Sequence, residues 1–277
     1  DQFIAGKEIT VEQEKGLTFS DYVFVERFRR QTKRYQNAMD FALKVFKDLP
    51  EKISIPTKCQ PSLINKVHFN TLHTELDSLL MNKVLEISSH TSGICLNSLL
   101  MACYFKLMNL WSGQNDLIIN MPVFNREQHL PNAKNIIGSF LDIFPVRIQT
   151  SPQEPIVSIA RKIEQFVRTM LEYPISSIEL SRKIAEQEGL KQSSLSAIIF
   201  SNSINMLPKG ISHSSRYLTI GAPKVQTGAP GTYIDLVMYT WENKWCFDWN
   251  YVRELFDAEY IQLLSEQFTS MLNQLVD

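Results

Sequence analysis

Residues 117–126 read LIINMPVFNR, and after IGSF at 137–140 the chain continues with IFPVRI at 143–148. Short apolar runs that are bounded by polar and glycine-containing segments are typical of buried β-strands. We therefore expect strands at 117–124 and 142–148. The segment between them is expected to form a polar loop that ends in a glycine turn.

Helices and strands alternate on both sides of this pair. The spacing of apolar residues predicts a helix from Ser20 to about Leu49, and the helix expected at 97–111 is apolar nearly all round, so it should be buried between layers. The other expected elements are a strand at 66–75, a helix at 76–89, helices at about 155–172 and 176–188, a strand at 195–200, strands at 232–240 and 244–250 joined at Glu242-Asn243, and a helix at about 257–275. This order predicts an α/β fold, a mixed β-sheet with flanking helices on one face.

Composition excludes several classes of protein. The chain has 277 residues, of which 44% are hydrophobic and 21% charged, and its net charge is −1. We expect no nucleic-acid binding because there is no basic excess, and no membrane span because no apolar run approaches ~18 residues. The first residue is Asp1, without a leader pattern, which favours a fragment of a larger protein.

The four cysteines are scattered, without a C-x-x-C pair. This spacing predicts neither a metal site nor a redox motif, and Cys95 and Cys103 are expected to be reduced core residues. A cytoplasmic location follows from this cysteine usage.

Ser201 and Asp235 are the candidate catalytic residues. Ser201 leaves the strand at 195–200 and Asp235 enters the strand at 232–240, so the two side chains should meet at neighbouring strand ends. A hydroxyl beside a carboxylate can form a proton relay in which the carboxylate acts as a base. The alternative is structural, with Ser201 ending a strand and Asp235 accepting backbone hydrogen bonds.

The segment at 117–148 resembles the carboxyl-terminal half of condensation-superfamily domains of nonribosomal peptide synthetases. In that family it builds the floor of a tunnel where two carrier-bound acyl groups meet, and we call it the floor segment. The resemblance implies a chloramphenicol-acetyltransferase-like lobe, with 1–60 as linker and helices leading into the lobe and 61–277 as the C-terminal subdomain. Within it we expect a floor loop at about 120–140 and a latch-like loop at about 201–230. The HHxxxDG motif of the family, and the DxxxxD form, are both absent from the chain.

Other phrases resemble the heterocyclisation branch, which makes thiazolines and oxazolines from Cys, Ser or Thr. Residues 200–203 read FSNS where that branch has FTSS, and 229–235 read APGTYID where it has TPQVWLD; its Thr and Asp are implicated in cyclodehydration. Residues 124–126 match its FNR. Asp235 followed by Leu236, and IGSF at 137–140, instead resemble ordinary condensation domains, so the sequence lies between the branches.

Four further residues are expected to line the tunnel or support it: Asn125, Arg126, Gly138 and Asn202. Arg126 at a strand exit suits the anchoring of loop carbonyls or a carboxylate, because its donors form a planar fork. Gly138 is expected in a turn with positive φ. No histidine is assigned to catalysis or to a metal, since none has triad or metal spacing.

The resemblance implies that the lobe joins carrier-bound aminoacyl or acyl thioesters, and the heterocyclisation phrases add cyclodehydration of Cys, Ser or Thr to that expectation. No cofactor is expected to bind directly, because substrates arrive on the 4′-phosphopantetheine of carrier proteins. Expected partners are the N-terminal half of the same domain, upstream and downstream peptidyl carrier proteins and an adjacent adenylation domain. The lobe alone is expected to be inactive.

Three alternatives remain open at this stage. The first two are an ordinary amide-forming condensation lobe and a non-catalytic module that docks carrier proteins. The third, a free-standing acetyltransferase of the same fold, would need its own catalytic histidine.

Overall fold

Six strands form one mixed sheet in the order β1-β6-β5-β4-β2-β3. The computed structural model describes residues 16–50, 55–124, 133, 136–189, 194–204 and 231–276. Neighbouring strands are antiparallel except for the two parallel pairs β2–β4 and β4–β5. The strands are β1 (Phe69–Glu75), β2 (Asp116–Phe124), β3 (Leu141–Gln149), β4 (Ile198–Asn202), β5 (Ile234–Trp241) and β6 (Lys244–Val252). The predicted mixed sheet with flanking helices is confirmed.

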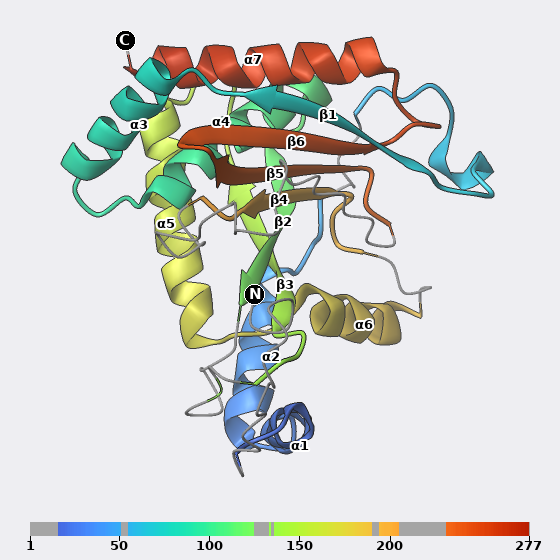
Figure 1. Cartoon of the computed structure of the whole chain (residues 1–277). Coiled ribbons are helices and arrows are strands. Elements are labelled where there is room, and N and C mark those ends of the chain that lie inside the picture. Colours follow the sequence, from blue (N-terminus) through green and yellow to red (C-terminus); the bar gives the residue numbers. More distant parts are fainter. Residues whose placement is uncertain are drawn as a thin grey trace, which may run out of the picture.

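The helices are α1 (Phe19–Arg29), α2 (Lys33–Val45), α3 (Ser78–His90), α4 (Leu96–Ser112), α5 (Ile156–Glu172), α6 (Ser177–Glu188) and α7 (Ala258–Val276). Figure 1 shows α7 lying along β1 and β6, while α5 and α6 lie on opposite sides of β3. None of the described helices is long and apolar enough to cross a membrane.

One face of the sheet packs against α4 and α7, and we call it the helix face. Every second residue of β6 points to it, because side chains alternate along a strand. The ring of Tyr104 in α4 lies 5.9 Å from that of Trp249, and the ring of Phe268 in α7 lies 5.6 Å from that of Phe247. Helix α4 is buried along most of its length, as its all-round apolar sequence predicts.

Helix α6 meets the other face of the sheet. Ser177 at its start donates a hydrogen bond of 3.0 Å to the side-chain oxygen of Asn120. Asn120 is in register with Ile199, which is in register with Asp235, so these residues share one face. The expectation that all helices lie on one face was therefore wrong for α6.

The predicted N-terminal helix is divided into α1 and α2. The hydroxyl of Thr32 accepts a hydrogen bond from the backbone N–H of Tyr35 and donates one to the carbonyl of Arg29, at 3.2 and 2.7 Å. Thr32 thus caps the start of α2 and separates it from α1. Helix α1 begins after Thr18, not Ser20, in a capping box with Asp21.

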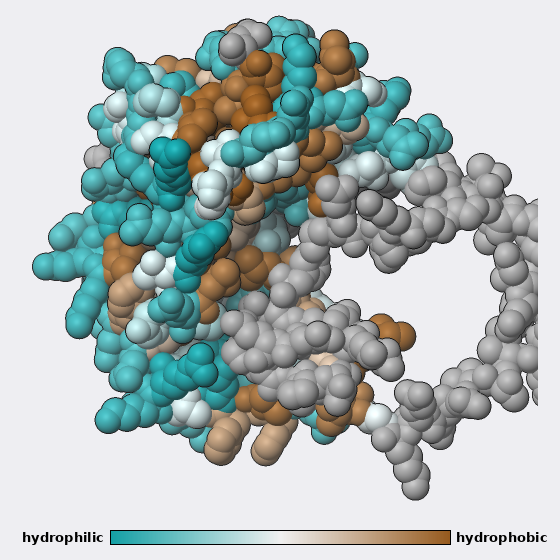
Figure 2. All heavy atoms as spheres, turned by 90° about the vertical axis from the view of Figure 1, so that its left-hand side faces the viewer, coloured by the Kyte–Doolittle hydropathy of each residue, from teal (hydrophilic) through white to brown (hydrophobic). Residues whose placement is uncertain are grey.

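The outer sides of α3 and α5 form a largely hydrophilic surface with separate hydrophobic areas, as Figure 2 shows. Such helices pack an apolar stripe inward and leave polar side chains in solvent.

Cys103 in α4 is fully buried, as predicted, and burial raises the pKa of its thiol to about 12. Cys95 was wrongly placed in the core: it is exposed and caps the start of α4.

Candidate functional site

The structure brings Ser201 and Asp235 together. The Ser201 hydroxyl donates a hydrogen bond of 2.8 Å to Oδ1 of Asp235, from the neighbouring strands β4 and β5. Asp235 is only 2% exposed, whereas Ser201 is half-buried. The hydroxyl is therefore the accessible member of the pair, and the carboxylate lies behind it.

The face that carries this pair is opposite to the helix face, and we call it the polar face, defined by Thr71, His73, Ser201, Asp235, Asp248 and Asn250. Asp235 is in register with Asn250 of β6, and the hydroxyl of Thr71 in β1 donates 2.7 Å to the Asn250 side-chain oxygen. The Asn250 side-chain nitrogen has no hydrogen-bond partner within the described part of the chain, although the residue is fully buried. A buried amide donor without a partner costs stability.

A histidine–aspartate pair lies two positions before Asn250 in β6. Nδ1 of His73 is 2.6 Å from Oδ1 of Asp248, and the hydroxyl of Tyr239 donates 3.2 Å to Oδ2. Burial and then the charge of Asp248 raise the pKa of the Tyr239 hydroxyl. From the sequence no histidine was given a role, and this pairing was missed. The alternation of Cys246, Asp248 and Asn250 with aromatic residues in β6 is the signal that could have revealed it.

Gly138 does not have the positive φ that was expected, since it is not among the described glycines with that conformation. Its small size is needed instead for close packing. A Cβ atom at this position would lie 2.1 Å from the ring of Phe19 in α1. Phe19 and Tyr22 pack there against Phe140, which closes a small apolar cluster at the floor segment.

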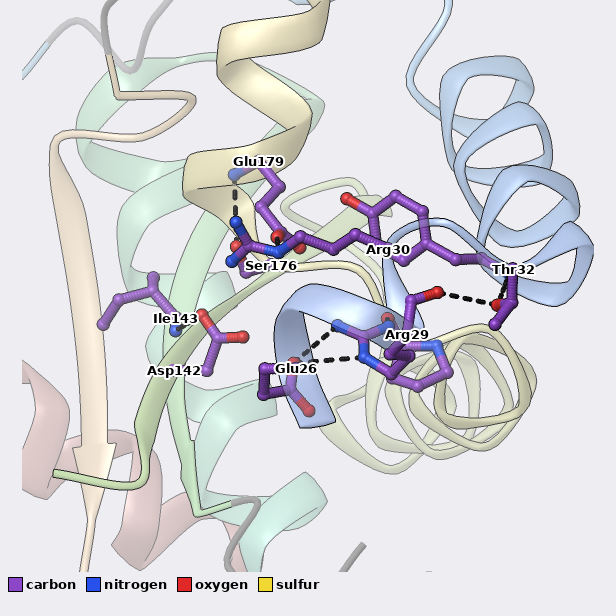
Figure 3. A network of polar contacts seen from close by, with 10 residues as sticks. Glu26, Arg29, Arg30, Thr32, Asp142, Ile143, Ser176 and Glu179 are labelled. Carbon is purple, nitrogen blue, oxygen red and sulfur yellow. Dashed lines mark hydrogen bonds and ion pairs between the residues drawn. The ribbon is translucent and has the colours of Figure 1, made fainter. Parts of the chain in front are cut away.

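A network of polar contacts supports the start of β3, where α1 and α6 approach it. Figure 3 shows its members: Glu26, Arg29, Arg30, Thr32, Asp142, Ile143, Ser176 and Glu179. Arg30 forms an ion pair of 2.7 Å with Glu179, and Arg29 one of 3.1 Å with Glu26. Burial raises the pKa of the Asp142 carboxyl, against the lowering effect of a 2.8 Å hydrogen bond from the Ile143 N–H. This arrangement braces the floor segment between two helices.

Asn202 lies on the opposite side of β4 from Ser201, as alternation along a strand requires. Its amide donates 3.1 Å to the side-chain oxygen of Asn97 at the start of α4, and its oxygen accepts 2.9 Å from the Ile204 N–H. Asn202 therefore joins β4 to α4 and does not share a face with Asp235. Asn125 and Arg126 lie outside the described residues, as does most of the predicted latch at 201–230.

The tryptophans of β5 and β6 are divided between the two faces of the sheet. Trp245 and Trp249 are buried on the helix face, where they contribute to the main core. Trp241 packs with Val237, Tyr239 and Cys246 in a separate small cluster on the other face. Large buried aromatics of this kind chiefly supply apolar area.

Comparisons with known proteins agree with this architecture. Over 263 residues the chain is 27% identical to bacitracin synthase 1 of Bacillus licheniformis, which covers 94% of this chain and 5% of that synthase. It is 24% identical over 214 residues to the pyochelin synthetase PchF of Pseudomonas aeruginosa, covering 75% of this chain and 12% of PchF. The chain thus spans a small part of each of these relatives.

Solved structures share the fold. The EpoB cyclization-docking bidomain of a nonribosomal peptide synthetase from Sorangium cellulosum superposes with a TM-score of 0.80 at 19% identity, covering 98% of this chain and 54% of that one. The X-domain from teicoplanin biosynthesis gives a TM-score of 0.78 at 16% identity, covering 99% of this chain and 62% of that one. The model of the condensation domain family matches residues 2–277. The chain therefore belongs to the condensation domain family.

Proposed function

We propose that this chain is the C-terminal lobe of a nonribosomal peptide synthetase condensation-type domain, with the Ser201–Asp235 pair at its reaction surface. The hydrogen bond between Ser201 and Asp235 on the polar face carries the proposal. Support for a lobe comes from coverage, because the chain matches 54% of the EpoB bidomain and 62% of the teicoplanin X-domain. The remaining part of the domain would supply the opposite wall of the channel.

The substrates in this proposal are two acyl groups held as thioesters on 4′-phosphopantetheine arms. The lobe would work with the N-terminal half of the domain, with upstream and downstream carrier proteins, and beside an adenylation domain. The amine of the downstream group attacks the upstream thioester carbonyl, an amide bond forms, and the upstream carrier thiol leaves. Holding both groups in one channel accelerates this step through proximity and orientation.

Ring closure is the finer part of the proposal. The side-chain thiol or hydroxyl of a Cys, Ser or Thr residue adds to the new amide carbonyl carbon and loses its proton. The carbonyl oxygen then departs as water while the amide nitrogen loses its proton and the C=N bond forms. Because Asp235 is buried behind Ser201, the Ser201 hydroxyl contacts the substrate in this scheme and Asp235 exchanges protons through it.

An ordinary amide-forming lobe is the second candidate, and Leu236 directly after Asp235 favours it. In that case the Ser201–Asp235 pair would only position the channel wall. A non-catalytic module that docks carrier proteins would show neither reaction. These three functions therefore differ in their products.

The test is Asp235→Asn in the complete domain, assayed with loaded carrier proteins. Asn keeps the shape and can still accept the Ser201 hydrogen bond, but it cannot take a proton. We expect amide formation to persist and ring closure to fall by about 10²–10⁴-fold, the usual contribution of a general acid–base group. Equal loss of both products would reject the proton-relay role, and amide formation without any ring closure in the unaltered domain would favour the ordinary condensation lobe.

Ser203→Ala is the matched control. Ser203 is also half-buried and lies two residues beyond Ser201, but its hydroxyl donates 3.0 Å to the backbone carbonyl of Met238. Both products should form at unaltered rates in this variant. A selective loss of ring closure in Ser203→Ala would show that the effect is not specific to the Ser201–Asp235 pair.

A further inference from the structure

We propose that His73 and Glu75 of β1 and Cys246 of β6 form a binding site for a borderline-soft divalent cation of the zinc class. The ligand atoms of these side chains lie within 4.8 Å of one another. Glu75 is in register with Cys246, and His73 with Asp248, so all of them point to the polar face. The two strands are hydrogen-bonded neighbours, which fixes the spacing of the ligands.

The donor set suits zinc. A histidine nitrogen, a carboxylate oxygen and a thiolate sulfur are its usual ligands, and a water molecule would complete a tetrahedral site. Bond lengths of about 2.0–2.3 Å place tetrahedral ligand atoms about 3.3–3.8 Å apart, so the cluster must contract by about 1 Å. The side chains of His73 and Glu75 are 46% and 45% exposed, which leaves room for a small shift toward the buried Cys246.

A second observation supports a site here: the Asp248 carboxylate contacts the His73 ring nitrogen that does not face Glu75. Asp248 is 1% exposed and contacts Nδ1 of His73 at 2.6 Å, while Nε2 faces Glu75 at 4.0 Å. Histidine ligands of metals usually donate their other nitrogen to a carboxylate, which sets the tautomer and the ring orientation. The Tyr239 hydroxyl holds the other oxygen of Asp248 and thereby fixes this support.

Lys244 would compete with a bound cation for Glu75. Its ammonium group lies 2.6 Å from Oε2 of Glu75, and it lowers the pKa of the Glu75 carboxyl. Metal binding would displace this ammonium group. Burial, followed by the charges of Glu75 and Asp248, raises the pKa of the Cys246 thiol to about 11, so a bound cation would have to release the thiol proton.

The site is separate from the Ser201–Asp235 pair. Cys246 and Asn250, the residue in register with Asp235, lie four positions apart on β6, which corresponds to roughly 13 Å. The inference therefore stands or falls independently of the proposed function. A metal here would tie the edge strand β1 to β6.

Titration of the full chain with Co²⁺, followed by displacement with Zn²⁺, tests the site. We expect one equivalent of Co²⁺ to bind with a thiolate-to-cobalt charge-transfer band in the near-ultraviolet, and Zn²⁺ to remove the band. Cys246→Ser should abolish the band, and Asp248→Asn should weaken binding by about 10–100-fold. Lys244→Ala should tighten binding, because it removes the competing ammonium group.

Two variants keep the test decisive. Cys95→Ser removes an exposed thiol elsewhere in the chain and should leave the band unaltered. If Cys246→Ser fails to fold by circular dichroism, His73→Ala decides, since its side chain is about half exposed. Absence of the band in the unaltered chain, its survival in the folded Cys246→Ser variant, or unaltered affinity in His73→Ala would overturn the proposal.

Discussion

The helix face and the polar face of the sheet are built from the same strands, yet they differ in what they bury. On the helix face, β6 contributes Phe247 and Trp249 to a cluster of rings with Phe268. On the polar face, the same strand buries Asp248 and Asn250, at 1% and 0% exposure. Buried aromatics stabilise a fold, whereas a buried polar group lowers the stability of the fold unless it forms hydrogen bonds.

The comparison teaches that the aromatic core and the polar side chains of our proposed reaction surface lie on opposite sides of one sheet. Period-two alternation allows a strand to serve a core with one set of side chains and a reactive surface with the other. Substitutions on the helix face should therefore change the free energy of unfolding strongly. Substitutions on the polar face should change the chemistry more than the stability.

The largest effect on stability is expected for Phe268→Ala. Its ring is fully buried and contacts Tyr104, Phe247 and Trp249. Removal should lower the free energy of unfolding by about 3–5 kcal/mol, measured by urea denaturation. Leu263→Ala on the same helix, where the side chain is 44% exposed, should stay within about 0.5 kcal/mol. A similar loss in both variants would remove the distinction between core and surface.

A smaller effect is expected for the pair on the polar face. Ser201→Ala and Asp235→Ala each remove the shared 2.8 Å hydrogen bond, and a double-mutant cycle of the two should show a coupling energy of about 0.5–3 kcal/mol. Urea denaturation of the two single variants and the double variant measures it. Additive effects would mean that the pair does not interact in solution.

The pH dependence of stability should include a contribution from Glu164, on the helix side of the sheet. Burial alone would raise the pKa of Glu164, but hydrogen bonds from Ser98, Cys95 and Arg168 outweigh it and hold the pKa at about 2. A lowered pKa in the folded state stabilises the fold above the unfolded pKa of about 4.3, and this contribution is lost as pH falls toward the folded value. The difference in unfolding free energy between the unaltered chain and Glu164→Gln should therefore shrink between pH ~4 and ~2. Denaturation midpoints at several pH values measure this difference. A difference independent of pH would contradict the expected contribution of Glu164.

The smallest effect is expected for Lys244→Ala without added metal. Its ammonium group, on β6, forms an ion pair with Glu75 of the edge strand β1, and both side chains are about half exposed. Solvent screens such pairs, so the thermal midpoint should not move measurably. A clear drop in the midpoint would show that the edge strand depends on this pair.

Much of the sheet could be predicted from the sequence, because apolar runs and alternation are local signals. The break at Thr32 was missed, since the apolar spacing continues through it and only the side-chain cap ends the helix. The meeting of Ser201 and Asp235 was predictable from two strand ends placed side by side. The contact of His73 with Asp248 was not, because its partner strand is distant in the sequence. The role of Gly138 depends on Phe19 of α1, a tertiary contact that no local pattern contains.

A comparison of Ser201→Thr with Ser201→Ala in the complete domain tests the central claim most directly. The quantity to measure is the ratio of ring-closed product to open amide formed from carrier-bound substrates. Because Thr keeps the hydroxyl that Asp235 holds, we predict an unaltered ratio for Ser201→Thr. For Ser201→Ala we predict a fall of about 10²-fold or more with amide formation retained. An unaltered ratio in Ser201→Ala would contradict the account.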